Sequence, residues 1–234
     1  RYTAAEGAPV ALLEQEFAEL MGSRYALAVS SCSAALFLSL KALDLPRGAK
    51  VLIPAFTFAA VPSAVVHADC TPVLVEVGEN YRVDMADFAA KLPGAACVLI
   101  SHMRGHTSDM DAIMAISHKH NLPVIEDNAH GLAVKSRYGA LGTIGSVAIQ
   151  SFHDTKNIHC GEGGAVLIND PALVEAAEIM REKGTNRSKF LRGQVDKYTW
   201  VDWGSSYLPS ELNAAVLDAQ LDAFEGIQER RFEI

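Results

Sequence analysis

The sequence lacks the motifs that mark metal-bound, disulfide-linked and membrane-embedded proteins. Its 4 cysteines form no CxxC pair, which argues against a zinc ribbon, a thioredoxin motif and a disulfide framework. No apolar run reaches the length of a membrane span, and the first residues do not resemble a signal peptide. We therefore expect a reduced, cytoplasmic protein with no membrane partner.

Positive charge is scarce as well. There are 20 Lys and Arg residues against 28 Asp and Glu residues, which gives a formal net charge of −8 at pH 7. That balance argues against a nucleic-acid partner or an anionic membrane surface. The 234 residues, half of them apolar, contain no repeat, Pro-rich linker or charge block, and they allow one large domain or two small ones with a sizeable core.

Short apolar runs alternate with amphipathic helical patterns along the chain. The apolar runs predict strands at residues 25–30, 51–53, 72–77, 97–101, 123–127, 146–152 and 165–168. Most runs are continuous rather than alternating, which indicates strands covered on both faces. The alternation of strands and helices predicts an α/β fold with a mostly parallel sheet flanked by helices.

Three helix starts are marked by capping residues. Ser108 and Asp111 form a capping-box pattern for a helix over residues 109–121. Asp170 precedes a proline at the first position of the next helix, and Ser210 begins a last helix running toward Ile234. These patterns predict the first residue of each helix.

Ligands of such sheets bind beyond the carboxyl ends of the strands. The first strand end is followed by a small, hydroxyl-rich loop, residues 30–33, that opens a helix over residues 34–43. Free backbone N–H groups at a helix start suit a phosphate, while the alternative is a serine N-cap without a ligand. No P-loop lysine or GxGxxG run is present, which argues against a nucleoside triphosphatase and a dinucleotide fold.

Two further strand ends carry charged residues. Glu126 and Asp127 end a strand, and because successive side chains point to opposite faces, only one of them can face a given site. The alternatives are a structural carboxylate and a carboxylate bonded to a cationic ligand nitrogen. Lys156 follows an apolar strand and precedes the glycine-rich return at residues 161–164. Alone it is typical of a solvated lysine, but beside a phosphate site and a strand-end acid it indicates a Schiff-base lysine.

Histidines and a long polar segment need separate interpretations. His102 and His106 lie near Asp109, but a glycine separates the pair and the sequence predicts a loop there, so we predict no metal site. His118 and His120 lie near a helix end, where contact with the helix dipole is the simpler account. Residues 182–206 form a long polar excursion, either a solvated loop or a binding segment. Its candidate anion-binding side chains are Arg187, Lys189, Arg192 and Lys197.

Taken together, these segments resemble the DegT-type sugar-nucleotide aminotransferases, a family of fold-type-I pyridoxal-phosphate enzymes. The resemblance covers essentially the whole chain, and its most specific part is SFHDTKNIHCGEGG at residues 151–164. It implies that Lys156 forms the Schiff base with the cofactor and moves the proton. It also implies that residues 1–234 are the cofactor-binding large domain, with an N-terminal segment and a C-terminal small domain of the family absent.

The resemblance assigns further cofactor contacts. Ser151 and the amides of Cys32 and Ser33 would hold the phosphate, Asp127 would pair with the pyridine nitrogen, and Phe58 would stack on the ring. The family usually has Ser-Gly-Thr where this chain has Ser-Cys-Ser at residues 31–33.

Two other positions depart from the family pattern. His130 stands where the family usually has glutamine. Ser206 stands where it usually has an asparagine that reaches the phosphate in the partner subunit. Residues 182–207 resemble the subgroup of dTDP-4-amino-4,6-dideoxygalactose transaminases.

The activity implied is amino transfer, with pyridoxal 5′-phosphate as cofactor, from L-glutamate to a nucleotide-linked keto sugar such as dTDP-4-keto-6-deoxyhexose. The partners implied are the sugar nucleotide, the amino-acid donor and a second copy of the chain in a homodimer with shared active sites. A sugar dehydratase of the same family is an alternative, although that branch is expected to have histidine in place of Lys156. A second alternative is a non-catalytic binding or regulatory module on this fold. A third, a nicotinamide-dependent dehydrogenase, is disfavoured because the glycine fingerprint is missing.

Overall fold

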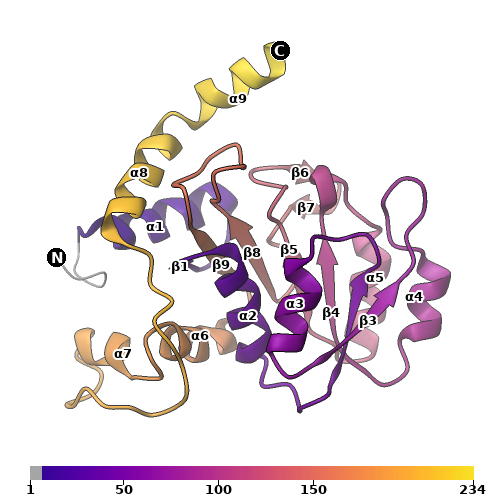
Figure 1. The fold of residues 1–234 in the computed structure, drawn as a ribbon, viewed down its shortest axis with the longest axis horizontal. Helices are drawn as coiled ribbons and strands as arrows, with labels where there is room; N and C mark the ends of the chain where they lie inside the picture. The colour runs from indigo at the N-terminus through magenta and orange to yellow at the C-terminus, as the bar shows by residue number, and fades with distance from the viewer. Residues whose placement is uncertain (1–6) are drawn as a thin grey trace.

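A seven-stranded sheet forms the centre of the protein, whose computed structural model describes residues 7–234. The spatial order is β1-β9-β8-β5-β4-β2-β3 (Figure 1). The strands are β1 (Ala26–Val29), β2 (Lys50–Pro54), β3 (Thr71–Val75), β4 (Ala95–Ser101), β5 (Val124–Asp127), β8 (Val147–Ser151) and β9 (Gly164–Ile168). Strand β9 runs antiparallel to both neighbours, and the other neighbouring pairs are parallel. The carboxyl ends of β1, β4, β5 and β8 therefore point toward the same edge of the sheet.

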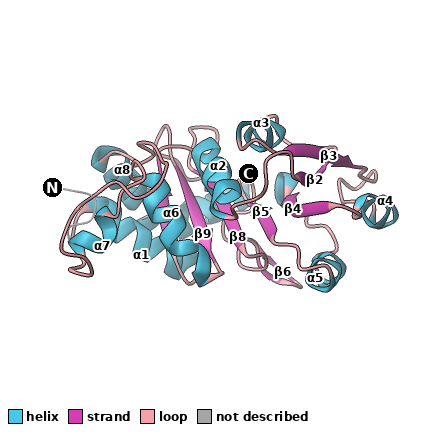
Figure 2. Ribbon diagram, turned by 90° about the horizontal axis from the view of Figure 1, so that it is seen from below, coloured by secondary structure: helices cyan, strands magenta, loops and turns pink. Residues whose placement is uncertain are grey.

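Helices cover both faces of this sheet (Figure 2). They are α1 (Pro9–Met21), α2 (Cys32–Ala42), α3 (Ala60–His67), α4 (Met85–Lys91), α5 (Met110–Lys119), α6 (Val174–Arg181), α7 (Arg187–Leu191), α8 (Glu211–Asp222) and α9 (Phe224–Glu233), with 3₁₀ turns η1 (Met103–Gly105) and η2 (Pro171–Leu173). One buried cluster joins the sheet to α2, α3 and α6. On the opposite face, α1 and α8 cover one end of the sheet and α4 and α5 cover the other.

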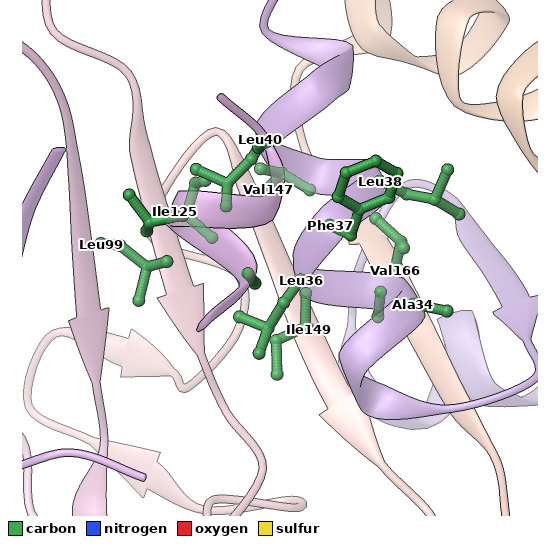
Figure 3. Packing of buried hydrophobic residues seen from close by; sticks show 14 of the residues in the cluster. Ala34, Leu36, Phe37, Leu38, Leu40, Leu99, Ile125, Val147, Ile149 and Val166 are labelled. Carbon is green, nitrogen blue, oxygen red and sulfur yellow. The ribbon is translucent and has the colours of Figure 1, made fainter. Parts of the chain in front are cut away.

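Helix α2 is the central helix of the first cluster. All residues from Ala34 to Leu40 are buried, so the helix has no polar face toward solvent there. Its side chains pack on strands β4, β5, β8 and β9 (Figure 3). Burial of each large aliphatic side chain contributes about 1.5–3 kcal/mol, so this contact holds the start of α2 firmly against the sheet edge.

The seven predicted strands and the mostly parallel α/β sheet are confirmed. Strands β1, β5, β8 and β9 are buried along their whole length, as their continuous apolar runs predict, whereas the edge strand β3 is partly exposed. The sequence pattern did not predict the short hairpin of β6 (Lys135–Ser136) and β7 (Gly139–Ala140). No helix within residues 7–234 combines the length and apolar character needed to cross a membrane.

Two details of the predicted helices are wrong. The capping box at α5 does not form, because the Ser108 hydroxyl accepts from the Val83 N–H while Asp109 caps the helix by accepting from the Ala112 N–H. Ser210 caps α8 as predicted, but the helix stops at Ala223, whose φ of −90° and ψ of 3° leave the helical region. A separate helix, α9, follows, and none of its residues is buried.

Candidate active site

A cavity of about 410 Å³ opens at the carboxyl ends of the strands. Seven of the eight predicted site residues line it: Cys32, Ser33, Phe58, Asp127, His130, Ser151 and Lys156. The side chains of Met103, His153, Thr155 and Glu162 also line it and were not singled out from the sequence. Three of these four flank Lys156 within the segment that carries the family resemblance, which was the available signal.

The N-terminus of α2 forms one wall of this cavity. Ser31 is the N-cap, and its hydroxyl accepts from the Ala34 N–H at 3.1 Å, while its carbonyl accepts from the Ala35 N–H at 3.1 Å. The first four N–H groups of a helix have no partner inside the helix. The amides of Cys32 and Ser33 are therefore left to face an anion at the positive end of the helix dipole.

Strand β9 packs against this loop through a glycine. A Cβ added to Gly164 would lie 2.6 Å from the carbonyl carbon of Ser31 and 2.7 Å from the amide nitrogen of Cys32. Any side chain there would displace the loop that carries the free amides. The close packing of β9 thus fixes the position of the helix start.

The Cys32 thiol stays protonated beside this wall. Burial raises the pKa of the thiol strongly, and the Asp127 carboxylate raises it further, against the opposing effects of Lys156 and a hydrogen bond with Ser151. A neutral thiol adds no negative charge next to an anion. The Ser151 hydroxyl is almost completely buried at the end of β8 and is close enough to share that bond.

Asp127 and Glu126 face opposite sides of β5, as the alternation of strand side chains predicts. Asp127 lines the cavity, and the hydrogen bond to its carboxylate from the described residues comes from the Ala129 N–H at 3.1 Å. Glu126 is fully buried on the other side. Its carboxylate accepts from the Nε2 of His102 at 2.9 Å and from the amides of residues 142, 144 and 145 at 2.7–2.9 Å.

The surroundings of Glu126 keep it charged. Burial alone would raise the pKa of this carboxyl, but the hydrogen bond and charge of His102 together with the N–H groups of Gly145 and Gly142 lower it. Glu126 is therefore the structural carboxylate of the pair, and it explains His102 without a metal. Within residues 7–234, no three His, Cys, Asp or Glu side chains are grouped so that they could hold a metal ion.

Lys156 lies in the loop that joins β8 to β9. Backbone bonds from Phe152 N–H to the Gly163 carbonyl and from Asp154 N–H to the Gly161 carbonyl, both 2.9 Å, extend the antiparallel pairing into this loop. The Lys156 N–H closes a turn onto the His153 carbonyl at 2.9 Å. The backbone around the lysine is therefore held in place, and its half-buried side chain faces the cavity.

Phe58 and His130 complete the cavity wall. The Phe58 side chain is 66% exposed although it is a large aromatic group, so one face of its ring is available to a planar ligand. The His130 ring is exposed at the cavity and accepts a hydrogen bond at Nδ1 from the Arg104 N–H at 3.2 Å.

Ser206, the eighth predicted residue, does not line the cavity. It is exposed, and the carbonyl oxygen of its neighbour Tyr207 accepts a hydrogen bond from the Ser30 N–H at 2.7 Å. Three basic side chains of the preceding segment form ion pairs within the chain: Arg187 with Glu182, Lys189 with Glu175, and Arg192 with Glu178. Their contacts give no support to the expectation that these three attract an anionic substrate.

The fold, an α/β domain with a mostly parallel seven-stranded sheet, is also found in solved aminotransferases. The aminotransferase from Psychrobacter cryohalolentis superposes with a TM-score of 0.87 at 31% identity, over 94% of this chain and 57% of that one. The S. venezuelae protein DesV, solved in complex with a ketimine intermediate, gives a TM-score of 0.83 at 32% identity, over 94% of this chain and 58% of that one.

Residues 2–234 match the model of the DegT/DnrJ/EryC1/StrS aminotransferase family, and the chain belongs to this family. The family is pyridoxal-phosphate-dependent. A curated relative is the spore coat polysaccharide biosynthesis protein SpsC of Bacillus subtilis, which is 33% identical over 98% of this chain. This chain spans 60% of the length of SpsC.

Proposed function

We propose that the protein is a pyridoxal-phosphate-dependent aminotransferase that moves an amino group from L-glutamate to a nucleotide-linked keto sugar such as dTDP-4-keto-6-deoxyhexose. The observation that carries this proposal is the single cavity in which Lys156, Asp127 and the free amides of α2 meet. Membership in a sugar aminotransferase family supports it, as does the role of the relative SpsC in polysaccharide biosynthesis.

The residues of the cavity fit pyridoxal phosphate. The phosphate needs uncommitted donors, which the amides of Cys32 and Ser33 provide at the positive end of α2, with the Ser151 hydroxyl beside them. The pyridine nitrogen needs an anionic partner, and Asp127 has a carboxylate oxygen left after its bond with Ala129. The flat ring matches the exposed face of Phe58.

Each residue then has a distinct task in the transfer. When bound, pyridoxal phosphate supplies an aldehyde that condenses with amines and a ring that withdraws electrons from the adjacent carbon. The Asp127 carboxylate would keep the ring nitrogen protonated, and Phe58 would pack on the ring. The Lys156 amine would hold the aldehyde group covalently, with release of water, and would serve as the base that moves a proton between the amino donor and the cofactor.

Trapping by reduction tests the role of Lys156. Borohydride treatment of the protein loaded with pyridoxal phosphate, followed by peptide mass spectrometry, should place the pyridoxyl group on the peptide that contains Lys156. A Lys135→Ala variant, which changes an exposed lysine on β6, should label in the same way. Labelling of another lysine in the unaltered protein would contradict the assignment.

We further propose that the chain acts as the large domain of a homodimer with shared active sites. Ser206 lies outside the cavity of its own chain and is exposed, so it is free to reach the phosphate site of a partner subunit. A two-fold axis makes such an exchange reciprocal, with two equivalent sites per dimer. Exposed aromatic side chains nearby, including Trp200 at 73% exposure, are consistent with a buried interface in the dimer.

Mixing two inactive subunits tests this arrangement. Full-length Lys156→Ala and Ser206→Glu proteins should each be inactive as homodimers, the second because an added carboxylate repels the phosphate. A random mixture should regain about one quarter of the activity, because half the dimers are mixed and each has one intact site. No recovery from verified mixed dimers would show that each chain builds its site alone.

A further inference from the structure

Helix α8 lies against the loop that carries Lys156 (Figure 1). Ala214 and Leu217 of this helix are buried in the same apolar cluster as Ile158, which follows Lys156 by two positions. Ile158 is fully buried although it belongs to a loop. An outward movement of the loop would expose this side chain to water, which is unfavourable. The apolar contact therefore ties the segment after Lys156 to α8.

A side chain of α8 also holds the backbone of this segment. The His159 N–H donates a hydrogen bond to the Oε1 of Gln220 at 2.9 Å. The two residues are 61 positions apart, so the bond joins two separate elements and does not close a local turn. Because a partly buried backbone N–H needs an acceptor, this bond favours one position of the loop.

Asn213, in the first turn of α8, makes a second connection. Its Nδ2 donates to the Glu162 carbonyl at 2.8 Å, where the loop returns to β9. Its Oδ1 accepts from the Ser210 hydroxyl at 3.1 Å, and its backbone N–H donates to the same hydroxyl at 3.1 Å. The cap of α8 thus fixes the orientation of the Asn213 amide toward the loop.

Helix α8 is itself held in place by α1. The Glu211 carboxylate at the start of α8 accepts from the Val10 N–H at 3.0 Å. On the same helix α1, the Phe17 ring packs edge-on against Phe152, with 5.0 Å between the ring centroids. Phe152 is the residue at which the loop leaves β8. The loop, α1 and α8 therefore pack together as one unit.

We propose that Gln220 and Asn213 are positioning residues for Lys156, which they hold where its amine reaches the aldehyde of pyridoxal phosphate. The catalytic half of this inference rests on the proposed function. The antiparallel bonds of residues 152 and 154 hold the backbone before Lys156, whereas α8 holds the backbone after it. Neither Gln220 nor Asn213 lines the cavity, so both act through the lysine and do not touch the cofactor.

Hydrogen exchange of the full-length protein tests the Gln220 contact without any ligand. In Gln220→Leu the His159 N–H loses its acceptor, so the peptide of residues 156–160 should exchange about five- to tenfold faster. Gln220→Glu keeps an oxygen acceptor and should exchange as the unaltered protein does. Gln15→Leu, at an exposed position of α1, is the control for the substitution itself. Unchanged exchange of this peptide in Gln220→Leu would overturn the inference.

The rate at which Lys156 captures the cofactor tests the positioning role. Pyridoxal phosphate is mixed with the protein, borohydride is added at successive times, and peptide mass spectrometry measures the fraction attached to Lys156. A misplacement of ~1 Å can lower a rate about 10²-fold, so we expect a 10- to 100-fold slower capture in Gln220→Leu and in Asn213→Ala. Gln220→Glu should restore the original rate. Asn213→Ala tests the same inference if Gln220→Leu does not fold.

Non-covalent binding separates positioning of the lysine from support of the whole cavity. In a Lys156→Ala background, the dissociation constant of pyridoxal phosphate should be the same with and without Gln220→Leu. A parallel loss of capture rate and of this binding would overturn the inference, as would an unchanged capture rate in both variants. Neither outcome affects the proposed function, which is overturned instead if Lys156 of the unaltered protein captures no cofactor.

Discussion

The end of β5 presents two adjacent carboxylates in opposite surroundings. Glu126 is fully buried, and His102 and the amides of residues 142, 144 and 145 surround its oxygens. Asp127, on the other face, lines a cavity and takes a hydrogen bond from Ala129 within the described residues. Within the described residues, Glu126 thus has hydrogen-bond partners from the chain at both carboxylate oxygens. Asp127 has an oxygen that can still bind a ligand.

This contrast separates structural from functional charge better than residue type does. A buried carboxylate with complete partners contributes to a unique fold and offers nothing to a ligand. A carboxylate with a free oxygen beside a lysine and a helix N-terminus is a candidate for binding and chemistry. Substitutions at the two positions should therefore affect different measurable quantities.

The largest effect is expected for Asp127→Asn, on the reaction rate. Loss of one preorganised electrostatic partner commonly costs ~10²–10³ in turnover. Stability should change little, because asparagine keeps an oxygen that can accept from the Ala129 N–H. Steady-state kinetics and thermal unfolding measure the two effects, and Asp154→Asn, an exposed neighbour of the cavity, is the control. Near-normal turnover would make Asp127 a structural residue like Glu126.

For Glu126→Gln we expect a loss of stability rather than a loss of reaction rate. The strand pattern alone predicts a mild effect of this change. In the structure, however, the NH₂ group of glutamine would face backbone N–H donors, and His102 would lose its carboxylate partner. Removing one partner of a buried pair costs about 3–5 kcal/mol, so urea unfolding should show a loss of that size. Glu79→Gln, in an exposed loop, should change stability little. A loss below about 1 kcal/mol would mean that Glu126 and its partners stabilise the fold no more than a solvent-exposed ion pair does.

The sequence predicted the surroundings of Asp127 at the cavity better than those of the buried Glu126. Asp127 and Lys156 follow apolar strands, and strand ends of a parallel sheet meet at one edge, so local pattern brings them together. The contact between His102 and Glu126 joins residues 24 positions apart through a loop packing that no local pattern encodes. A signal was present nonetheless, because an acid inside an apolar strand requires a partner.

Glycines explain why that partner could not be identified from the sequence. The amides that bind Glu126 come from a turn in which Gly142 has a φ of 92° and a Cβ at Gly145 would lie 2.6 Å from the Val124 carbonyl oxygen. In the sequence, the absence of a GxGxxG run showed only that a dinucleotide fingerprint is missing. The turn directly follows the hairpin of β6 and β7, and those short strands have no sequence pattern of their own.

The acid side of the stability profile should also report on Glu126. The folded protein lowers the pKa of Glu126 below its usual value of 4.5, so the unfolded chain takes up this proton at a higher pH than the folded one. The stability from Glu126 is therefore fully present above about pH 4.5 and is lost as pH falls through the folded pKa. Urea unfolding from about pH 7 downward should show a shallower loss for Glu126→Gln than for the unaltered protein. Equal slopes would contradict the lowered pKa.

The smallest effect expected concerns two serines with the same helix-capping geometry. The hydroxyls of Ser31 and Ser210 each accept from an N–H three residues later at 3.1 Å, at the starts of α2 and α8. Replacing either with alanine should cost about 1 kcal/mol of stability. Only Ser31→Ala should also weaken binding of pyridoxal phosphate, because fraying of the first turn of α2 moves the amides of Cys32 and Ser33 away from the phosphate. Absorbance titration with the cofactor measures this, and equal affinity in the two variants would show that the start of α2 is a cap without a ligand.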